Sequence, residues 1–346
     1  MKSLKIPPAG LRYDGMIGTG GIGSGVFLSL EGKHTLGREE SRPCRILDRR
    51  DYCKLHIISH YVQSLLGSGF EVIPAGKIGD DEAGKRLLRE MQEVGLCTRH
   101  VHTVTELPTL FSYCFLYPDG SGGNITTADS ASGHVAPADI CLLEDDMRHL
   151  GRRGMALAVP EVSLSARIEL LNMARQYGLF CVASFTSGEM PEAARRNLFQ
   201  KIDLLAVNAD EAGMAVGMAS DGVDRVVVAA AAMKALAAAN PKMMISVTGG
   251  AAGSWSWDGT HVSHVPTFPV PVVSTAGAGD AHIAGMIAGL ALGLDLCAAQ
   301  ILGSLHAALS VTSPHTINAE IDLAALRQLA STGGDIPDGV RAALEE

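Results

Sequence analysis

The sequence predicts an α/β fold in which a mostly parallel sheet is covered by helices on both faces. Short apolar segments of strand character alternate with helical segments through the second half of the chain, and this alternation is typical of parallel sheets. Strands are predicted at 180–183, 204–207 and 243–247, and helices at 166–177, 191–198 and 226–239. Hydrophobic residues make up 47% of the 346 residues but aromatic residues only 5%, so aliphatic side chains must build most of the core.

The first element contains the glycine-rich segment Gly18 to Gly23, which matches the dinucleotide-binding pattern Gly-x-Gly-x-x-Gly. Glu39 and Glu40 lie at about the distance at which that fold places its ribose-binding acid. The pattern also requires a helix directly after the glycines. Residues 24–30 instead have the composition of a strand, and a loop-like segment follows them. An NAD-dependent dehydrogenase is therefore the least favoured of three functional alternatives.

Two early segments interrupt the alternation of strands and helices. Residues 31–51 are charged and show no periodicity, whereas 103–130 contain a β-rich run at 110–117. Between these two segments, a strand and turn at 70–84 lead into a helix at 85–94, which Gly95 should end.

The most informative motif is Ser-Thr-Ala-Gly-Ala-Gly-Asp at 274–280, followed by a helical segment at 281–292. Small residues allow a polyanion to approach the unpaired N–H groups of a helix's first turn. The carboxylate of Asp280 is suited to take a proton from an attacking hydroxyl. An anion cradle beside a base indicates phosphoryl transfer, although Asp280 could also serve only as an N-terminal charge on the helix dipole.

This motif resembles the second signature of the ribokinase-like carbohydrate kinases, the PfkB family. The resemblance implies that Asp280 is the catalytic base and that the backbone of Gly277, Ala278 and Gly279 forms the anion hole for the transferred phosphate. It further implies a three-layer fold with a small β-lid over the sugar. The matching segments run roughly from Phe70 to the C-terminal helices.

A second segment, Leu204 to Glu211, ends an apolar strand in Asn-x-x-Glu. An amide and a carboxylate three residues apart can hold hydrated Mg²⁺ beside phosphates, because Mg²⁺ prefers oxygen ligands and keeps several waters. Asn208 and Glu211 could equally form a capping box at the start of the next helix. The resemblance favours a magnesium site, and the two interpretations are compatible.

A third segment places Thr248, Gly250 and Gly253 in a Thr-x-Gly-x-x-Gly turn after a strand. Glycines permit close backbone approach to a ligand. In the PfkB family this turn contacts the nucleotide. An asparagine of that family, which lies near the adenine of the nucleotide, aligns loosely with Ser304. The resemblance thus implies ATP as the phosphate donor, bound by Thr248, Gly250, Gly253, Asn208 and Ser304.

The sugar-binding half departs from the family. Residues 18–30 contain no acid where typical members have a sugar-binding Asp, and Ser274 replaces an acid that helps to hold a monovalent cation. The replacement of this acid puts activation by a monovalent cation in doubt. We expect Arg42, Lys54 and His56 to bind the substrate, since Arg and Lys recognise phosphate and carboxylate groups. The alternative is a solvated lid edge.

We expect one domain spanning 1–346, with a lid contributed by approximately 31–55 and 103–130. The net charge of −9 argues against a nucleic-acid surface, and no apolar run is long enough to span a membrane. The start of the chain lacks a signal-peptide core, and seven dispersed cysteines indicate a reducing compartment, so a cytoplasmic location is expected. The family resemblance also makes a homodimer formed through the lid plausible.

The sequence therefore predicts an ATP- and Mg²⁺-dependent carbohydrate kinase that acts on a hydroxyl of a sugar, polyol or sugar acid. The second alternative is a nucleotide-binding regulator of the same fold that has lost sugar phosphorylation. The retained Asp280 argues against the regulator, whereas the altered sugar contacts argue for it.

Overall fold

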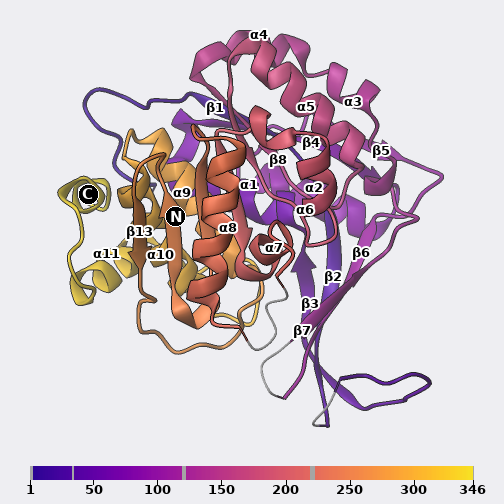
Figure 1. Ribbon diagram of the computed structural model, residues 1–346. Coiled ribbons are helices and arrows are strands. Elements are labelled where there is room, and N and C mark those ends of the chain that lie inside the picture. The colour runs from indigo at the N-terminus through magenta and orange to yellow at the C-terminus, as the bar shows by residue number, and fades with distance from the viewer. Residues whose placement is uncertain (1–2, 33–34, 119–121, 219–222, 346) are drawn as a thin grey trace.

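A nine-stranded sheet forms the centre of the computed structural model, which describes residues 3–32, 35–118, 122–218 and 223–345 (Figure 1). The strand order is β13-β12-β11-β10-β9-β8-β1-β4-β5. Neighbouring strands pair in parallel from β11 to β5, and β12 and β13 extend the sheet as an antiparallel hairpin. The strands are β1 (Gly15–Thr19), β4 (Glu71–Gly79), β5 (His100–Val104), β8 (Gly154–Ala158), β9 (Phe180–Ala183), β10 (Leu204–Asn208), β11 (Met244–Thr248), β12 (Ser254–Trp257) and β13 (Val262–Val265).

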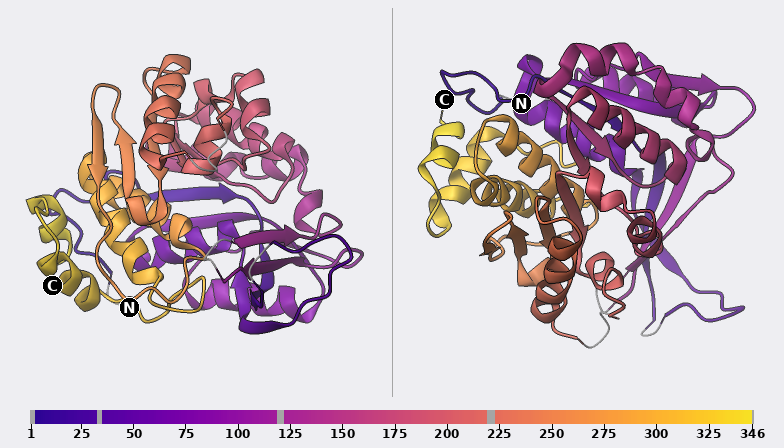
Figure 2. Two further views of the ribbon diagram at one scale, coloured as in Figure 1. Left: turned by 60° about the horizontal axis from the view of Figure 1, so that its bottom comes forward. Right: turned by 45° about the horizontal axis from the view of Figure 1, so that its top comes forward.

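Helices cover both faces of this sheet, as the left view of Figure 2 shows. The core on one face is completed by α1 (Lys54–Leu66), α2 (Glu82–Glu93), α9 (Ala278–Ala291), α10 (Leu296–Ser310), α11 (Leu323–Thr332) and α12 (Asp338–Ala343). The core on the other face is completed by α3 (Pro137–Cys141), α4 (Glu144–Leu150), α5 (Leu164–Tyr177), α6 (Met190–Arg195), α7 (Ala209–Met214) and α8 (Arg225–Ala239). Met16 and Ile17 illustrate the division, because successive strand residues point to opposite faces. The predicted α/β fold with a mostly parallel sheet and two helical layers is confirmed.

A second, four-stranded sheet projects from the body with the strand order β3-β2-β6-β7. It comprises β2 (Gly23–Leu30), β3 (Cys44–Tyr52), β6 (Leu110–Leu116) and β7 (Gly122–Thr126). Residues 35–43, which precede β3, extend away from the body (Figure 1). Within the two ranges predicted to form the lid, residues 33–34 and 119–121 lie outside the described part of the chain.

All of the strand β3 except Tyr52 lies within 31–51, a segment in which the sequence shows no periodicity. Its residues from Cys44 to Leu47 are all exposed, and Arg45, Arg49 and Arg50 place charge on this edge strand. Exposed charged edges prevent pairing with other chains, and they also remove the hydrophobic alternation by which a strand is recognised.

The glycines at 18–23 allow the turn from β1 to β2 to pack closely against neighbouring segments. A Cβ atom at Gly21 would lie 2.3 Å from Oε2 of Glu161, and one at Gly23 would lie 2.8 Å from Sγ of Cys53. A strand, β2, follows these glycines directly. The helix that a dinucleotide-binding turn requires is therefore missing, as the sequence predicted.

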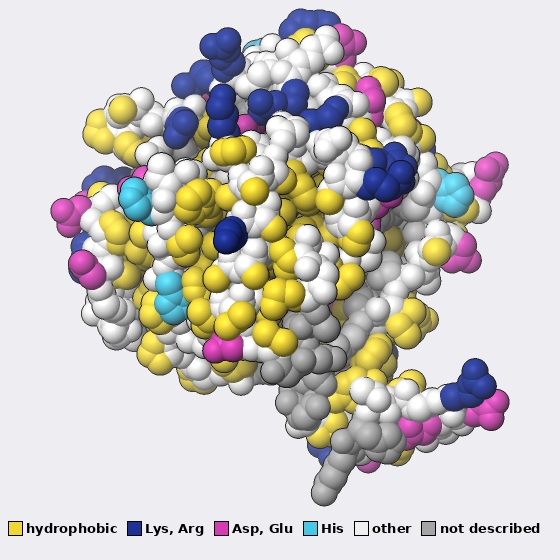
Figure 3. All heavy atoms as spheres, viewed as in Figure 1, with side chains coloured by type: hydrophobic (Ala, Val, Ile, Leu, Met, Phe, Trp, Pro, Cys, Tyr) yellow, Lys and Arg dark blue, Asp and Glu magenta, His cyan; other side chains and the backbone are white. Residues whose placement is uncertain are grey.

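The face seen in Figure 3 is weakly charged over α8 and carries Lys and Arg side chains near α4 and α5. Several arginines of this region form ion pairs, including Arg148 with Glu144 and Arg175 with Asp203. In the described part of the chain, no helix is both long enough and apolar enough to cross a bilayer.

Candidate active site

The candidate site lies where α9 begins, above the carboxyl ends of β10 and β11. Gly277 is the N-cap of α9 and adopts φ = +77°, and a Cβ atom there would lie 2.7 Å from the carbonyl oxygen of Thr316. Glycine is the residue that tolerates a positive φ and also has no Cβ atom to clash with this oxygen. The helix begins at Ala278, three residues earlier than predicted, so Asp280 and the unpaired N–H groups belong to the same first turn.

Asp280 is 8% exposed and forms an ion pair with Lys54, the first residue of α1. The Lys54 Nζ atom lies 3.2 Å from Asp280 Oδ1. Burial raises the pKa of Asp280, and the Lys54 ammonium opposes this by charge and by hydrogen bonding. The lysine thus helps to keep a buried carboxylate ionised.

Lys54 lies among three carboxylates. Burial alone would lower the pKa of Lys54, but Asp280, Glu211 and Glu161 outweigh burial and hold that pKa above its ordinary value. The ammonium is therefore charged across the physiological pH range. Three acids around one lysine leave an excess of negative charge, which an added cation would neutralise.

Glu161 is a site residue that sequence reasoning missed. It follows β8 in a left-handed conformation with φ = +76°, and its Oε2 atom accepts a hydrogen bond of 3.2 Å from the backbone N–H of Lys54. Burial raises the pKa of Glu161 to about 7, although Lys54 acts in the opposite direction. In the sequence, the one feature that could have indicated Glu161 is its place as an acidic residue shortly after an apolar strand.

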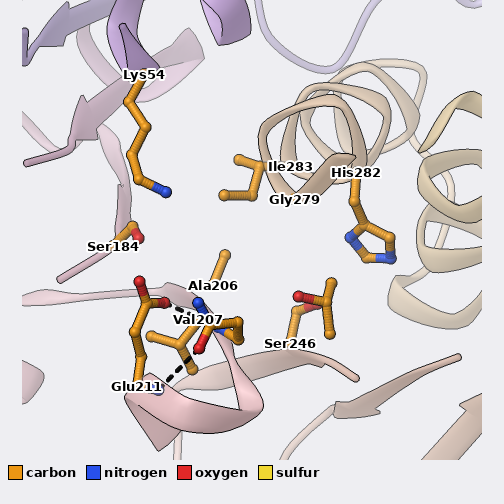
Figure 4. Close-up of a pocket in the computed structure, with 11 residues that line it drawn as sticks. Lys54, Ser184, Ala206, Val207, Glu211, Ser246, Gly279, His282 and Ile283 are labelled. Carbon is orange, nitrogen blue, oxygen red and sulfur yellow. Dashed lines mark hydrogen bonds between the residues drawn. The ribbon is translucent and has the colours of Figure 1, made fainter. Parts of the chain in front are cut away.

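Asn208 and Glu211 form the capping box that the sequence allowed. The Asn208 side chain accepts a 2.8 Å hydrogen bond from the Glu211 N–H, and Glu211 Oε2 accepts one of 2.9 Å from the Asn208 N–H. Both residues also line the pocket that contains Lys54 (Figure 4). Capping therefore positions these side chains at the site and leaves the magnesium interpretation open.

The pocket has a volume of about 40 Å³ and joins several predicted residues. Asn208, Glu211, Thr248, Gly279 and Lys54 line it. In Figure 4 the Lys54 ammonium and the Glu211 carboxylate face one another across it. The remaining lining residues are Ser184, Ala206, Val207, Ser246, His282 and Ile283, which the sequence analysis did not single out.

Other predicted nucleotide contacts lie outside this lining. Gly253 has φ = +90°, and a Cβ atom there would lie 2.3 Å from the Val265 carbonyl oxygen, so contacts within the protein already require a glycine. Gly250 also adopts a positive φ, at the start of a 3₁₀ turn. The Ser304 hydroxyl lies 3.1 Å from that of Ser254 and is thus already paired.

Two predicted substrate residues are placed away from the pocket lining. Arg42 lies in the connection between β2 and β3 and forms an ion pair with Glu40. His56 is fully buried, and its ring lies between those of Tyr52 and His60, with centroid distances of 4.7 and 6.3 Å. Of the three predicted substrate residues, the pocket lining includes Lys54.

The donor set suits Mg²⁺ held largely through water and phosphate. The described residues contain no group of three or more His, Cys, Asp or Glu side chains arranged to hold a metal. Mg²⁺ in phosphoryl-transfer sites typically uses one or two carboxylates plus substrate phosphates. Glu211 and the uncompensated negative charge around Lys54 fit that requirement.

Comparison with known proteins decides the family. Residues 60–322 match the family model described as pfkB family carbohydrate kinase. The chain belongs to this family. The matched range includes the Gly-Ala-Gly-Asp turn at 277–280.

Similar proteins include a bifunctional ribokinase/ribose-5-phosphate isomerase A of Fructilactobacillus sanfranciscensis, 26% identical over 242 residues. That alignment covers 69% of this chain and 42% of the relative, so the pfkB chain matches less than half of that protein's length. The deoxyribokinase of Salmonella typhi is 26% identical over 250 residues, covering 71% of this chain and 77% of the relative.

A solved structure supports the fold. The ribokinase of Giardia lamblia superposes with a TM-score of 0.74 at 16% sequence identity, covering 92% of this chain and 98% of that chain. The pfkB chain therefore has the ribokinase-like α/β fold that the sequence motifs predicted.

Proposed function

We propose that this pfkB kinase transfers the γ-phosphate of ATP to a hydroxyl of a sugar, polyol or sugar acid, with Asp280 as general base. The observation that carries the proposal is the position of Asp280 in the first turn of α9. Its carboxylate shares that turn with the Gly277–Gly279 backbone and contacts Lys54. A base beside an anion-binding helix terminus is suited to hydroxyl activation and phosphate stabilisation together.

In this mechanism Asp280 accepts the proton of the acceptor hydroxyl as the oxygen attacks the phosphorus. The backbone of Gly277, Ala278 and Gly279 stabilises the charge that develops on the transferred phosphate. Lys54 holds the Asp280 carboxylate in its ionised form and adds positive charge at the same place.

Bound Mg²⁺ would supply charge neutralisation for the phosphates of ATP. Asn208 and Glu211 would hold it through their positions at the pocket, and Thr248 borders the same space. We further propose that the turn containing Gly250 and Gly253 and the α10 residue Ser304 lie along the nucleotide.

The substrate class is also a proposal. Relatives named deoxyribokinase and fructoselysine 6-kinase indicate a small carbohydrate-derived acceptor. We propose that the acceptor lies between the main sheet and the sheet of β3, β2, β6 and β7, in one functional domain. Lys54 is the predicted substrate residue whose position supports contact with the acceptor.

The test is ADP release from Mg-ATP in the presence of sugars, polyols, sugar acids and nucleosides. We expect turnover on at least one compound, and we expect Asp280→Asn to lower kcat by at least about 100-fold, in keeping with the usual contribution of general-base catalysis. Asp338→Asn, which changes an exposed acid on α12, is the matched control and should retain native activity.

Unchanged turnover in Asp280→Asn would exclude Asp280 as the base. ATP binding without turnover on any acceptor would favour the nucleotide-binding regulator.

We also propose a homodimer formed through the projecting sheet. Tyr113 and Ile125 are opposite each other on β6 and β7 and are 47% and 62% exposed, and Ile46 on β3 is 45% exposed. An exposed apolar sheet face is typical of an interaction surface. Sedimentation should give twice the chain mass for the native protein and a lower mass for Ile125→Lys. A monomeric native protein would contradict the dimer.

A further inference from the structure

Three polar side chains in the pocket lack any hydrogen-bond partner. They are Ser184, Ser246 and His282, whose exposed fractions are 1%, 1% and 2%. Both hydroxyl oxygens and both ring nitrogens of His282 are unpaired. Buried polar atoms without partners are uncommon, because each loses its hydration without compensation. Four such atoms around one cavity indicate that the cavity has an occupant.

The three side chains come from different elements and line the same pocket. Ser184 follows β9, Ser246 lies within β11, and His282 lies on α9 two residues after Asp280. Figure 4 shows the His282 ring projecting from α9 toward the sheet, on the same side as Ser246, and the Ser184 hydroxyl near Lys54 and Glu211. Ser246 and His282 therefore border one part of the pocket, and Ser184 borders the part next to Lys54 and Glu211.

A neighbouring buried serine on the same sheet face is paired, although unpaired buried atoms also occur outside the pocket, for example at His56 and Ser59 of α1. Ser246 pairs directly with Ser256 of β12. The Ser256 hydroxyl donates a 2.6 Å hydrogen bond to Gln300, whose amide donates one of 2.9 Å to Ser254. The buried serine away from the pocket is thus fully paired, whereas the serine lining the pocket is not.

The cavity has the size and chemistry required for bound water. Its volume is about 40 Å³, and each water needs roughly 10–15 Å³ and 2–4 polar partners. Ser184, Ser246 and His282 offer both donors and acceptors, and Lys54 and Glu211 border the same space. A neutral imidazole presents one donor and one acceptor. Burial lowers the pKa of His282 to about 4, so the ring is neutral at physiological pH.

We propose that Ser184, Ser246 and His282 form a hydration site occupied by a small cluster of ordered water molecules. These waters pair the four unpaired atoms with one another and with Glu211 and Lys54. They line the floor of the cleft, beneath the place proposed for the phosphates and Mg²⁺. Ser246 and His282 are thus positioning residues that act through water, and the hydration site does not depend on phosphoryl transfer.

A high-resolution crystal structure of the native chain tests the occupant directly. We expect water peaks at hydrogen-bond distances of about 2.7–3.2 Å from each of the three side chains. An empty cavity overturns the proposal. So does a single peak with ligand distances of about 2.0–2.5 Å, since that spacing identifies a metal ion.

Substitution tests the same inference by the sign of the change in Tm. If water fills the cavity, Ser246→Ala and His282→Phe each remove or displace water-mediated hydrogen bonds and lower Tm. If the cavity is dry, the same changes remove unsatisfied polar atoms and raise Tm. A Tm equal to or above the native value in both variants overturns the proposal. Ser256→Ala is the matched control and should lower Tm in either case, because it breaks the bond to Gln300.

Nucleotide binding separates this inference from the proposed function. Mg-ATP should raise the Tm of the native protein, and this shift should be smaller in His282→Phe than in Ser256→Ala. An equal shift in the two variants overturns the positioning role of His282. A native protein that Mg-ATP does not stabilise would contradict the kinase proposal, while the crystallographic test still decides the hydration site.

Discussion

At the residue scale, the site is organised around the charge of Lys54. This side chain contacts Asp280, and Glu211 and Glu161 also raise its pKa. The positive charge is what allows Asp280 to stay ionised despite its burial. Burial is the largest influence on the pKa of each of the three acids and raises it, and Lys54 opposes burial at all three.

The native protein should lose stability as pH rises, because the buried Glu161 carboxyl ionises, and Glu161→Gln should abolish this loss. The pKa of Glu161 is about 7 in the folded protein, against about 4.5 when unfolded. A raised carboxyl pKa favours the folded state most below about pH 4.5, and this contribution disappears as pH rises through 7. The difference is on the order of 3 kcal/mol.

We expect Glu161→Gln to be more stable than the native protein at pH 8 and to differ less at pH 5. Urea denaturation at both pH values measures this change in the free energy of unfolding. Glu345→Gln, at an exposed carboxylate near the C-terminus, is the control and should show the native pH dependence. A Glu161→Gln protein with the native pH dependence would contradict the assignment of this titration to Glu161.

At the element scale, α9 is held in place by its contact with α10. A Cβ atom at Gly285 of α9 would lie 2.7 Å from the Cα atom of Gly303 of α10. The two helix backbones therefore touch, and this contact fixes the depth at which α9 places Asp280 over the sheet. Gly285 and Gly303 are accordingly required for packing, not for a turn.

Gly285→Ala should destabilise the protein although alanine favours helices. The added methyl group meets backbone atoms that cannot move aside, and such overpacking costs about 1–3 kcal/mol. Urea denaturation should show this decrease in the free energy of unfolding. Gly188→Ala, where no heavy atom lies within 4 Å of the new methyl group, should have little effect. Equal stability of the two variants would contradict the close helix contact.

At the scale of the whole molecule, histidines with lowered pKa values lie on three packed helices, α1, α9 and α10. Burial lowers the pKa of His56 to about 3, and those of His60, His282 and His306 to about 4. The ring of Tyr61 on α1 packs on that of His306 on α10, with centroids 4.4 Å apart. Neutral rings thus form part of the hydrophobic layer that carries the site.

The protein should lose stability as pH falls from about 6.5 towards 4. In the unfolded chain these histidines bind protons below about pH 6.5, whereas the folded state resists protonation until about pH 3 to 4. Each pKa unit corresponds to about 1.4 kcal/mol. Tm measured across this range should fall steeply, and less steeply in His56→Leu. His261→Asn, at an exposed ring, should retain the native slope. A flat native profile would contradict neutral burial.

Local motifs could be predicted from the sequence because they act between residues close in the chain. The Gly277–Asp280 turn and the Asn208–Glu211 capping box depend on spacings of three residues. The strand at 180–183 was predicted with the bounds that β9 has, because a short apolar run between two helical segments defines it. The edge strand β3 lies in the range predicted to contribute to the β-lid, but its bounds were not predicted, since its exposed charged residues conceal its periodicity.

The sequence by itself thus determined the fold class, the family and the position of the proposed base. Only the tertiary structure brought Lys54 to Asp280, 226 residues away, and placed Ser184 and His282 in the lining of the same pocket. It also brought Glu161 to the backbone of Lys54. The physical reason is that parallel strands end at one edge of a sheet, where residues far apart in the chain become neighbours. The ion pairs, the burial of the site's side chains and the shifts in their pKa values all arise from those neighbours. A local sequence pattern therefore cannot predict them.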